Sequence, residues 1–266
     1  MHVILFSQNS STTDSIIHRS LKAGYRQSND RSSLESMCWP ANWEKIMFLV
    51  VIILTFAASW LVRAWMTRTY DKWGAVPNAV GANGHQVARH ILDTNELQHV
   101  QLEVSKGKLS DHYIPSQDLM RLSESINNDA SVASIAVAAH ECGHALQDKE
   151  EYAMLKLKAA MMPMAVLGNQ LGLLLTIGGG ILGSATVANI GLMLIGIGVL
   201  MPVLTLPIEF DASKRALVEL QRLNLVDKKD YDGAKSMLLA AALTYVASAV
   251  SSMALIGVFL IRFIKR

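Results

Sequence analysis

The chain has 266 residues, of which 51% are hydrophobic and 17% are charged, and its formal net charge is +2. So few charges in so apolar a chain are typical of a membrane protein rather than a soluble enzyme. The basic residues are scattered instead of forming a stripe, so we expect no nucleic-acid partner. Two cysteines, Cys38 and Cys142, are too few for a disulfide framework.

Residues 1–45 are polar and rich in Ser and Asn, without a hydrophobic period. The apolar patch Val3–Phe6 is too short for the core of a secretory signal peptide. We therefore expect an N-terminal extension over 1–45 that is disordered.

The first strong feature is the run from Ile46 to Trp65. It is apolar as far as Val62, and basic residues and tryptophans border both ends. At 1.5 Å per residue the run spans roughly 30 Å, the thickness of a bilayer core. The sequence therefore predicts a transmembrane helix over 46–65, anchored at the two interfaces by its flanking residues.

Residues 66–160 have the composition of a soluble region. A short helix is predicted over Gly84–Leu92. Alternating apolar residues over Val100–Val104, and a second short run at Leu119–Leu122, predict a sheet of two or three strands. Ser131–Gln147 is rich in Ala and Val and predicts a helix, whose N-cap we expect among residues 127–129.

Three more segments complete the chain. Two apolar runs within 163–206 are joined by an uncharged, Gly-rich link at 183–185, which predicts a transmembrane helical hairpin. Residues 207–236 are charged again and are predicted to form a further helix. The last apolar run, within 237–262, predicts a fourth transmembrane helix.

The segment from Ala139 to His144 contains the pattern H-E-x-x-H. On a helix, His140 and His144 lie on the same face, so both imidazoles can bind one Zn²⁺ ion. Glu141 follows the first histidine and can act as general base toward a water molecule. The pattern also occurs by chance, but the helix predicted around it provides the context that a zinc site requires.

A third protein ligand is needed, and no histidine follows His144. The best acidic candidate is Glu209, at the end of the third apolar run. The hairpin would return the chain to the side that it left and so bring Glu209 back to the motif. The alternative is that Glu209 is only a solvated residue at a membrane boundary.

The chain resembles the YugP-type family of neutral zinc metallopeptidases, bacterial membrane proteins distantly related to HtpX-type and CAAX-prenyl-type proteases. The resemblance covers roughly residues 66–250 and rests on four segments: Gly84–Asp93, Leu109–Tyr113, Val137–Gln147 and Leu206–Ser213. It implies a mainly α integral membrane protein with a small α+β, zincin-like catalytic domain of the gluzincin type. It also implies one Zn²⁺ per chain and a multi-pass location in the bacterial plasma (inner) membrane.

In the distant relatives the third zinc ligand is the Glu of an E-F-x-A-D-like helix. The segment beginning at Glu209 matches this pattern except that Ser213 stands in place of Asp. The residue that supports a zinc-binding histidine is therefore open between Ser213, a weaker neutral acceptor, and Asp211. His112 and Tyr113 are candidates for the cleft or for stabilising an oxyanion, although a histidine in a turn is usually only solvated.

These features predict a membrane-embedded zinc endopeptidase, in which Glu141 takes the proton of the attacking water. Its partners would be the lipid bilayer and a protein or peptide substrate, held by strand addition at Val100–Val104 or Leu119–Leu122. A transporter would need ionisable residues within its spans, and these are almost free of them. A catalytically silent zinc-binding scaffold, or a chaperone-like quality-control factor, remains the alternative.

The membrane orientation follows from the basic residues. Segments 66–160 and 209–236 carry ligands for the same ion and must share one side of the membrane. Both are rich in Lys and Arg, whereas the hairpin link has no charge, so the positive-inside rule predicts a cytoplasmic catalytic side. The basic residues at the two ends of the chain oppose this orientation locally.

Overall fold

The computed structural model describes residues 43–264. The predicted extension over 1–45 lies outside the described residues, apart from the three that begin the first helix. The chain divides after Leu49 into two compact units, and the second, from Val50 on, contains every element except the first turns of that helix.

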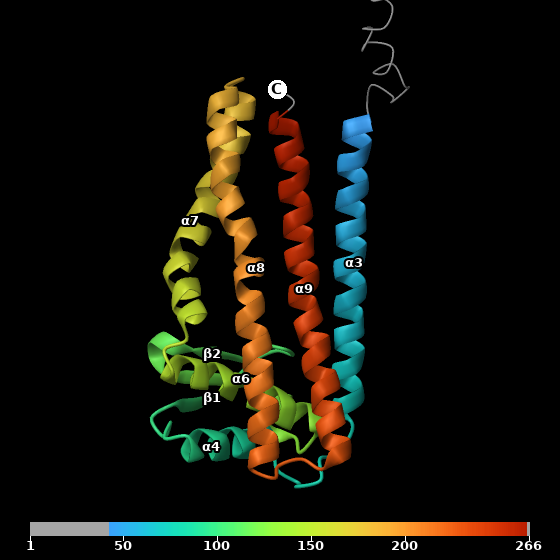
Figure 1. Ribbon diagram of the computed structural model, residues 1–266, viewed down its shortest axis with the longest axis vertical. Coiled ribbons are helices and arrows are strands. Elements are labelled where there is room, and N and C mark those ends of the chain that lie inside the picture. The colour runs from blue at the N-terminus through green and yellow to red at the C-terminus, as the bar shows by residue number, and fades with distance from the viewer. Residues whose placement is uncertain (1–42, 265–266) are drawn as a thin grey trace, which may run out of the picture. The chain divides into compact units, whose positions relative to one another are not determined.

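Within the described residues, four helices are long and apolar enough to cross a membrane. They are α3 (Trp43–Gly74), α7 (Ala153–Ile181), α8 (Ala185–Arg222) and α9 (Lys228–Ile264) (Figure 1). The prediction of a mainly helical fold with four apolar spans is confirmed.

Helix α3 is longer than the span predicted over 46–65. Residues 66–73 contain neither proline nor glycine, so nothing interrupts the helical hydrogen bonds where the apolar run ends. The helix ends at Gly74, shortly before Pro77. The apolar run thus marks the part of the helix suited to lipid, but not where the helix ends.

The hairpin predicted over 163–206 is formed by α7 and α8, which both extend beyond it. Its turn contains Gly183 at φ +66°, and the Ser184 hydroxyl caps the N-terminus of α8. The two helices pack closely, since a Cβ on Gly191 would lie 2.4 Å from the backbone nitrogen of Thr176. Such small residues are what allow helix backbones to approach in lipid.

The segment 207–236 is not one helix, contrary to the prediction, because α8 continues into it and then ends. Asn224 adopts a left-handed conformation (φ 53°), and the N–H of Leu225 donates to the carbonyl of Leu220 at 2.9 Å. This arrangement is a common way to end a helix. Glu209 therefore belongs to the same continuous helix that begins at the hairpin turn.

A small mixed sheet contains β1 (Gln101–Ser105), β2 (His112–Ile114) and β3 (Leu119–Ser123), in the order β1-β3-β2. β3 pairs in parallel with β1 and antiparallel with β2. Because β3 is central, the expectation that Leu119–Leu122 could be a free edge for a substrate is wrong. β2 has only three residues, too few to show an alternating pattern in the sequence.

Three shorter helices complete the soluble region. α4 (Gly84–Thr94) forms where predicted and begins with a capping box between Asn83 and Gln86. α5 (Glu124–Asn128) occupies most of the region in which an N-cap was expected, so that expectation is wrong. α6 (Val132–Lys149) is instead capped by Ser131, whose hydroxyl accepts from the Ser134 N–H at 3.1 Å.

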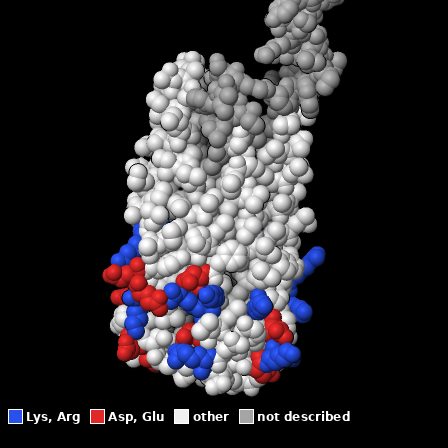
Figure 2. Space-filling view, in the orientation of Figure 1, with Lys and Arg blue, Asp and Glu red and all other residues white. Residues whose placement is uncertain are grey.

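Charged side chains gather at one end of the unit. On the face shown in Figure 2, Lys, Arg, Asp and Glu lie around the end that holds α4, α6 and the sheet, and the long helices beyond it show an uncharged surface (Figures 1 and 2). A core of fully buried residues, including Ile91, Met120 and Ile135, stabilises this charged end.

Candidate metal centre

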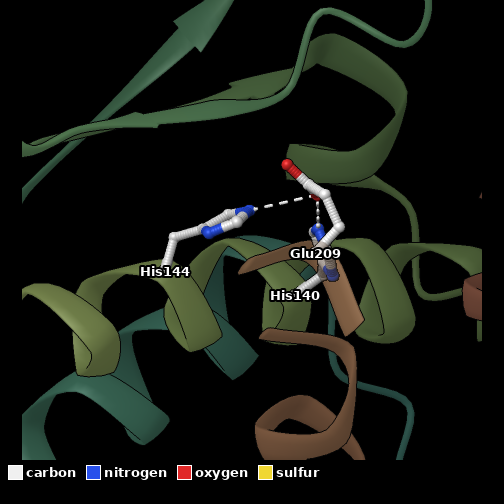
Figure 3. A group of neighbouring side chains, drawn as sticks. All are labelled: His140, His144 and Glu209. Carbon is white, nitrogen blue, oxygen red and sulfur yellow. Dashed lines mark hydrogen bonds and ion pairs between the residues drawn. The ribbon is translucent and has the colours of Figure 1, made fainter. Parts of the chain in front are cut away.

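Two histidines from α6 and a glutamate from α8 converge where these helices cross (Figure 3). The Nε2 atoms of His140 and His144 lie 3.3 and 3.5 Å from the same oxygen, Oε2 of Glu209. One ligand atom from each residue lies within 4.8 Å of the other two. The imidazole rings meet edge to face, with an interplanar angle of 83°.

The close approach of α6 and α8 depends on Gly143. A Cβ at this position would lie 2.4 Å from the carbonyl oxygen of Ala212, closer than real Cβ atoms come to any neighbour. Gly143 directly precedes His144, and Ala212 lies one turn beyond Glu209. This backbone contact therefore sets the separation between the histidines and the carboxylate.

His144 is held by Gln147, one turn further along α6. Nδ1 of His144 lies 3.0 Å from Oε1 of Gln147. The amide nitrogen of Gln147 donates to the Ile208 carbonyl (2.8 Å) and to the Asp211 carboxylate (2.9 Å), so its oxygen must face the histidine. An amide oxygen only accepts, so Nδ1 carries the proton and Nε2 directs its lone pair at the cluster.

His140 is held by Ser213. Its Nδ1 lies 3.2 Å from the Ser213 hydroxyl, so the residue that departs from the family pattern still reaches the histidine. Asp211 points elsewhere, because residues two apart differ by about 200° around a helix. It accepts from Arg215 (2.6 Å) and acts on the cluster only through Gln147.

These side chains fit a metal ion. The Glu209 carboxylate is only 4% exposed, and a buried carboxylate requires a positive partner. Within the described residues, Nε2 atoms of the two histidines are the basic groups nearest to it, and no Lys or Arg forms an ion pair with it. Two imidazole nitrogens and one carboxylate oxygen are the three protein ligands of a catalytic zinc site, which leaves a fourth position open.

Glu141 lies beside the cluster and, with His140, lines a cavity of about 300 Å³. Burial raises the pKa of the Glu141 carboxyl, which is the direction that suits a general base near neutral pH. Asp111 and Tyr245 line the same cavity.

His112 and Tyr113 lie in β2 rather than in a turn. His112 is exposed, with Nδ1 2.8 Å from the Ser110 carbonyl. The Tyr113 hydroxyl donates to the Asp148 carboxylate at 3.0 Å. These hydrogen bonds do not reach the cluster, and a role for either residue in the cleft stays a prediction.

Sequence reasoning missed Gln147 and Tyr245. The spacing of Gln147 from His144, three residues along one helix, is a signal that could have identified it. Tyr245 lies in the last apolar run and has no sequence relation to the motif, so only the packing of α9 on α6 and α8 reveals it. Cys142 is buried, with its thiol toward the Ala88 carbonyl and not toward the cluster.

Known proteins provide independent information on the chain. Residues 47–264 match the family described as "Putative neutral zinc metallopeptidase". Over 208 residues the chain is 35% identical to "Putative membrane protease YugP" of Bacillus subtilis (strain 168), a match that covers 78% of this chain and 92% of that protein. No solved structure matches the chain.

Proposed function

The chain belongs to the neutral zinc metallopeptidase family, and from this premise we propose that it is an integral-membrane zinc endopeptidase. The observation that supports this most strongly is the convergence of both Nε2 atoms on the buried Glu209 carboxylate, beside Glu141. One zinc ion bound there would supply electrophilic activation of a water molecule and of the scissile carbonyl.

The remaining steps belong to the protein's own side chains. Glu141 accepts the proton of the attacking water and passes it to the leaving amine. The Tyr245 hydroxyl donates a hydrogen bond to the carbonyl oxygen as negative charge develops there. Gln147 and Ser213 fix the two histidine rings, and the free edge of β2, which packs on α6, holds the extended peptide by strand addition.

The same proposal includes a location. The charged end of the protein carries the cluster, whereas the turn between α7 and α8 carries no charge. The positive-inside rule then predicts that the catalytic end lies in the cytoplasm of a bacterial cell, with the four helices in the plasma membrane.

Metal content and hydrolysis together test this function. Purified protein should hold about one zinc per chain, and His140→Ala, His144→Ala and Glu209→Ala should lose it. Glu141→Gln should keep the zinc and lose hydrolysis of casein in detergent, because only the base is changed. A wild-type protein that binds zinc without hydrolysing any peptide would instead support the silent-scaffold alternative.

A further inference from the structure

The cavity beside Glu141 lies between two of the membrane-spanning helices. From α3 it is lined by Arg63 and Met66, and from α9 by residues between Met237 and Tyr245. The chain before β2 adds Leu109 and Asp111. The proposed catalytic base therefore faces a space that these two helices largely line.

Half of the twelve residues that line the cavity are apolar: Met66, Leu109, Val137, Met237, Leu238 and Ala241. Among the polar lining residues, His140 and Glu141 lie at the end of the cavity where the substrate would react. An apolar pocket with a few convergent polar groups suits a ligand that is apolar along most of its length and polar where it reacts. A polypeptide with apolar side chains next to the cleaved bond has this character.

The cavity lies where the charged part of the protein gives way to the apolar part. Along α3, Arg63 is the last charged residue before an uncharged run back to residue 46. Along α8, the corresponding residue is Glu209, since residues 185–208 carry no charge. The uncharged surface beyond this level is seen in Figure 2. The reacting groups are thus at the level of a bilayer boundary.

Helix α3 borders this cavity but contacts the other long helices at few positions. Its exposed apolar side chains include Ile53, Leu54, Phe56, Trp60 and Leu61. Among the described residues, the side-chain hydrogen bond that joins α3 to α9 is between Ser59 and Ser251, with 3.4 Å between the two Oγ atoms. Interhelical hydrogen bonds of this kind are weak, so α3 can separate from α9 more easily than α7 can separate from α8.

We propose that the substrates are membrane-anchored polypeptides, whose extended segment next to the bilayer reaches Glu141 by passing between α3 and α9. This rests on the proposed peptidase function. Water adds across the scissile C–N bond, so that one product ends in a carboxylate and the other begins with an amine. The anchor stays in the lipid while the cleaved segment occupies the apolar cavity.

A reversible cross-link between the two helices tests this route. Ser59→Cys and Ser251→Cys are combined in a protein that lacks Cys38 and Cys142, and the zinc-loaded protein is placed in liposomes. Two substrates with the same cleavable sequence are compared. One is a free peptide, and the other is fused to an apolar transmembrane helix in the same liposomes. The single variants, oxidised in parallel, are the controls.

In the reduced state we expect the anchored substrate to be cleaved at least about 10-fold faster than the free peptide, because the anchor raises its local concentration. Oxidation should abolish cleavage of the anchored substrate and leave cleavage of the free peptide. Equal rates for the anchored substrate before and after oxidation would overturn the proposal. If the wild-type protein hydrolyses neither substrate, the proposed peptidase function is wrong. The route between α3 and α9 is then tested by measuring substrate binding.

Binding is measured without catalysis in Glu141→Gln. A photoreactive side chain at Thr244, which lines the cavity, should cross-link to the anchored substrate. The same group at Val250, which is 59% exposed further along α9, is the control and should react mainly with lipid. Equal cross-linking of the substrate at both positions would show that it does not use the cavity.

Discussion

The two histidines of the candidate metal centre are oriented by different kinds of partner. The amide of Gln147 can face His144 with only its oxygen, because its nitrogen is used by two acceptors. The hydroxyl of Ser213 can donate or accept, so it restrains the ring of His140 without choosing its tautomer. The tautomer of His144 is therefore set by its partner, whereas the tautomer of His140 is not.

Ser213→Ala should weaken zinc binding about 10-fold to 100-fold, the usual effect of removing a residue that orients a metal-bound histidine. Competition with a chelator measures the affinity. Thr205→Val is a matched control on the same helix, because the Thr205 hydroxyl bonds to the Pro202 carbonyl instead. Unchanged affinity in Ser213→Ala would show that the hydroxyl does not support the ligand.

Tyr245→Phe should lower kcat about 10²-fold to 10³-fold, the effect of losing one hydrogen-bond donor to a developing oxyanion. KM and zinc content should change little, since the ring remains in place. Tyr231→Phe, in a different cavity, is the control. If Tyr245→Phe loses its zinc, the phenol orients Glu209 and does not serve the oxyanion.

At the scale of helices and strands, hydrophobic runs predicted which segments span the membrane but not where each helix ends. α8 passes through Pro207 and ends only at a left-handed residue, a tertiary outcome that the apolar run does not encode. The candidate site likewise contains residues that local sequence predicts and residues that only the tertiary structure reveals. His140, Glu141 and His144 follow from local spacing, whereas Tyr245 depends on how α9 packs.

Gly143→Ala tests whether the contact of α6 with α8 assembles the metal centre. The added methyl group would meet backbone at Ala212, which cannot move as a side-chain tip would, so α8 must shift. We expect loss of zinc and a lower melting temperature. Gly196→Ala is the control, because nothing lies within 4 Å of the added Cβ. This variant should keep its zinc and the melting temperature of the wild type. Full zinc occupancy in Gly143→Ala would mean that the helices tolerate a wider separation.

For the whole molecule, the segregation of charge predicts the orientation in the membrane. Single cysteines replace Ser184 in the hairpin turn and Lys149 at the end of α6, in a protein that lacks Cys38 and Cys142. On intact cells an impermeant thiol reagent should label position 184 only, and position 149 should react after permeabilisation. The reverse pattern would place the catalytic end outside the cell.

The uncharged turn at 182–184 also bears on how the protein matures during synthesis. Both histidines are made before the hairpin, and Glu209 is made after it. Because the turn has no charge to carry across lipid, α7 and α8 can insert as a pair. Insertion of the pair returns Glu209 to the side of the membrane on which the two histidines lie. Until then the nascent chain has two of the three proposed ligands, and we expect it to bind zinc weakly. On the proposed function, peptidase activity therefore arises only after the hairpin has been inserted in a membrane.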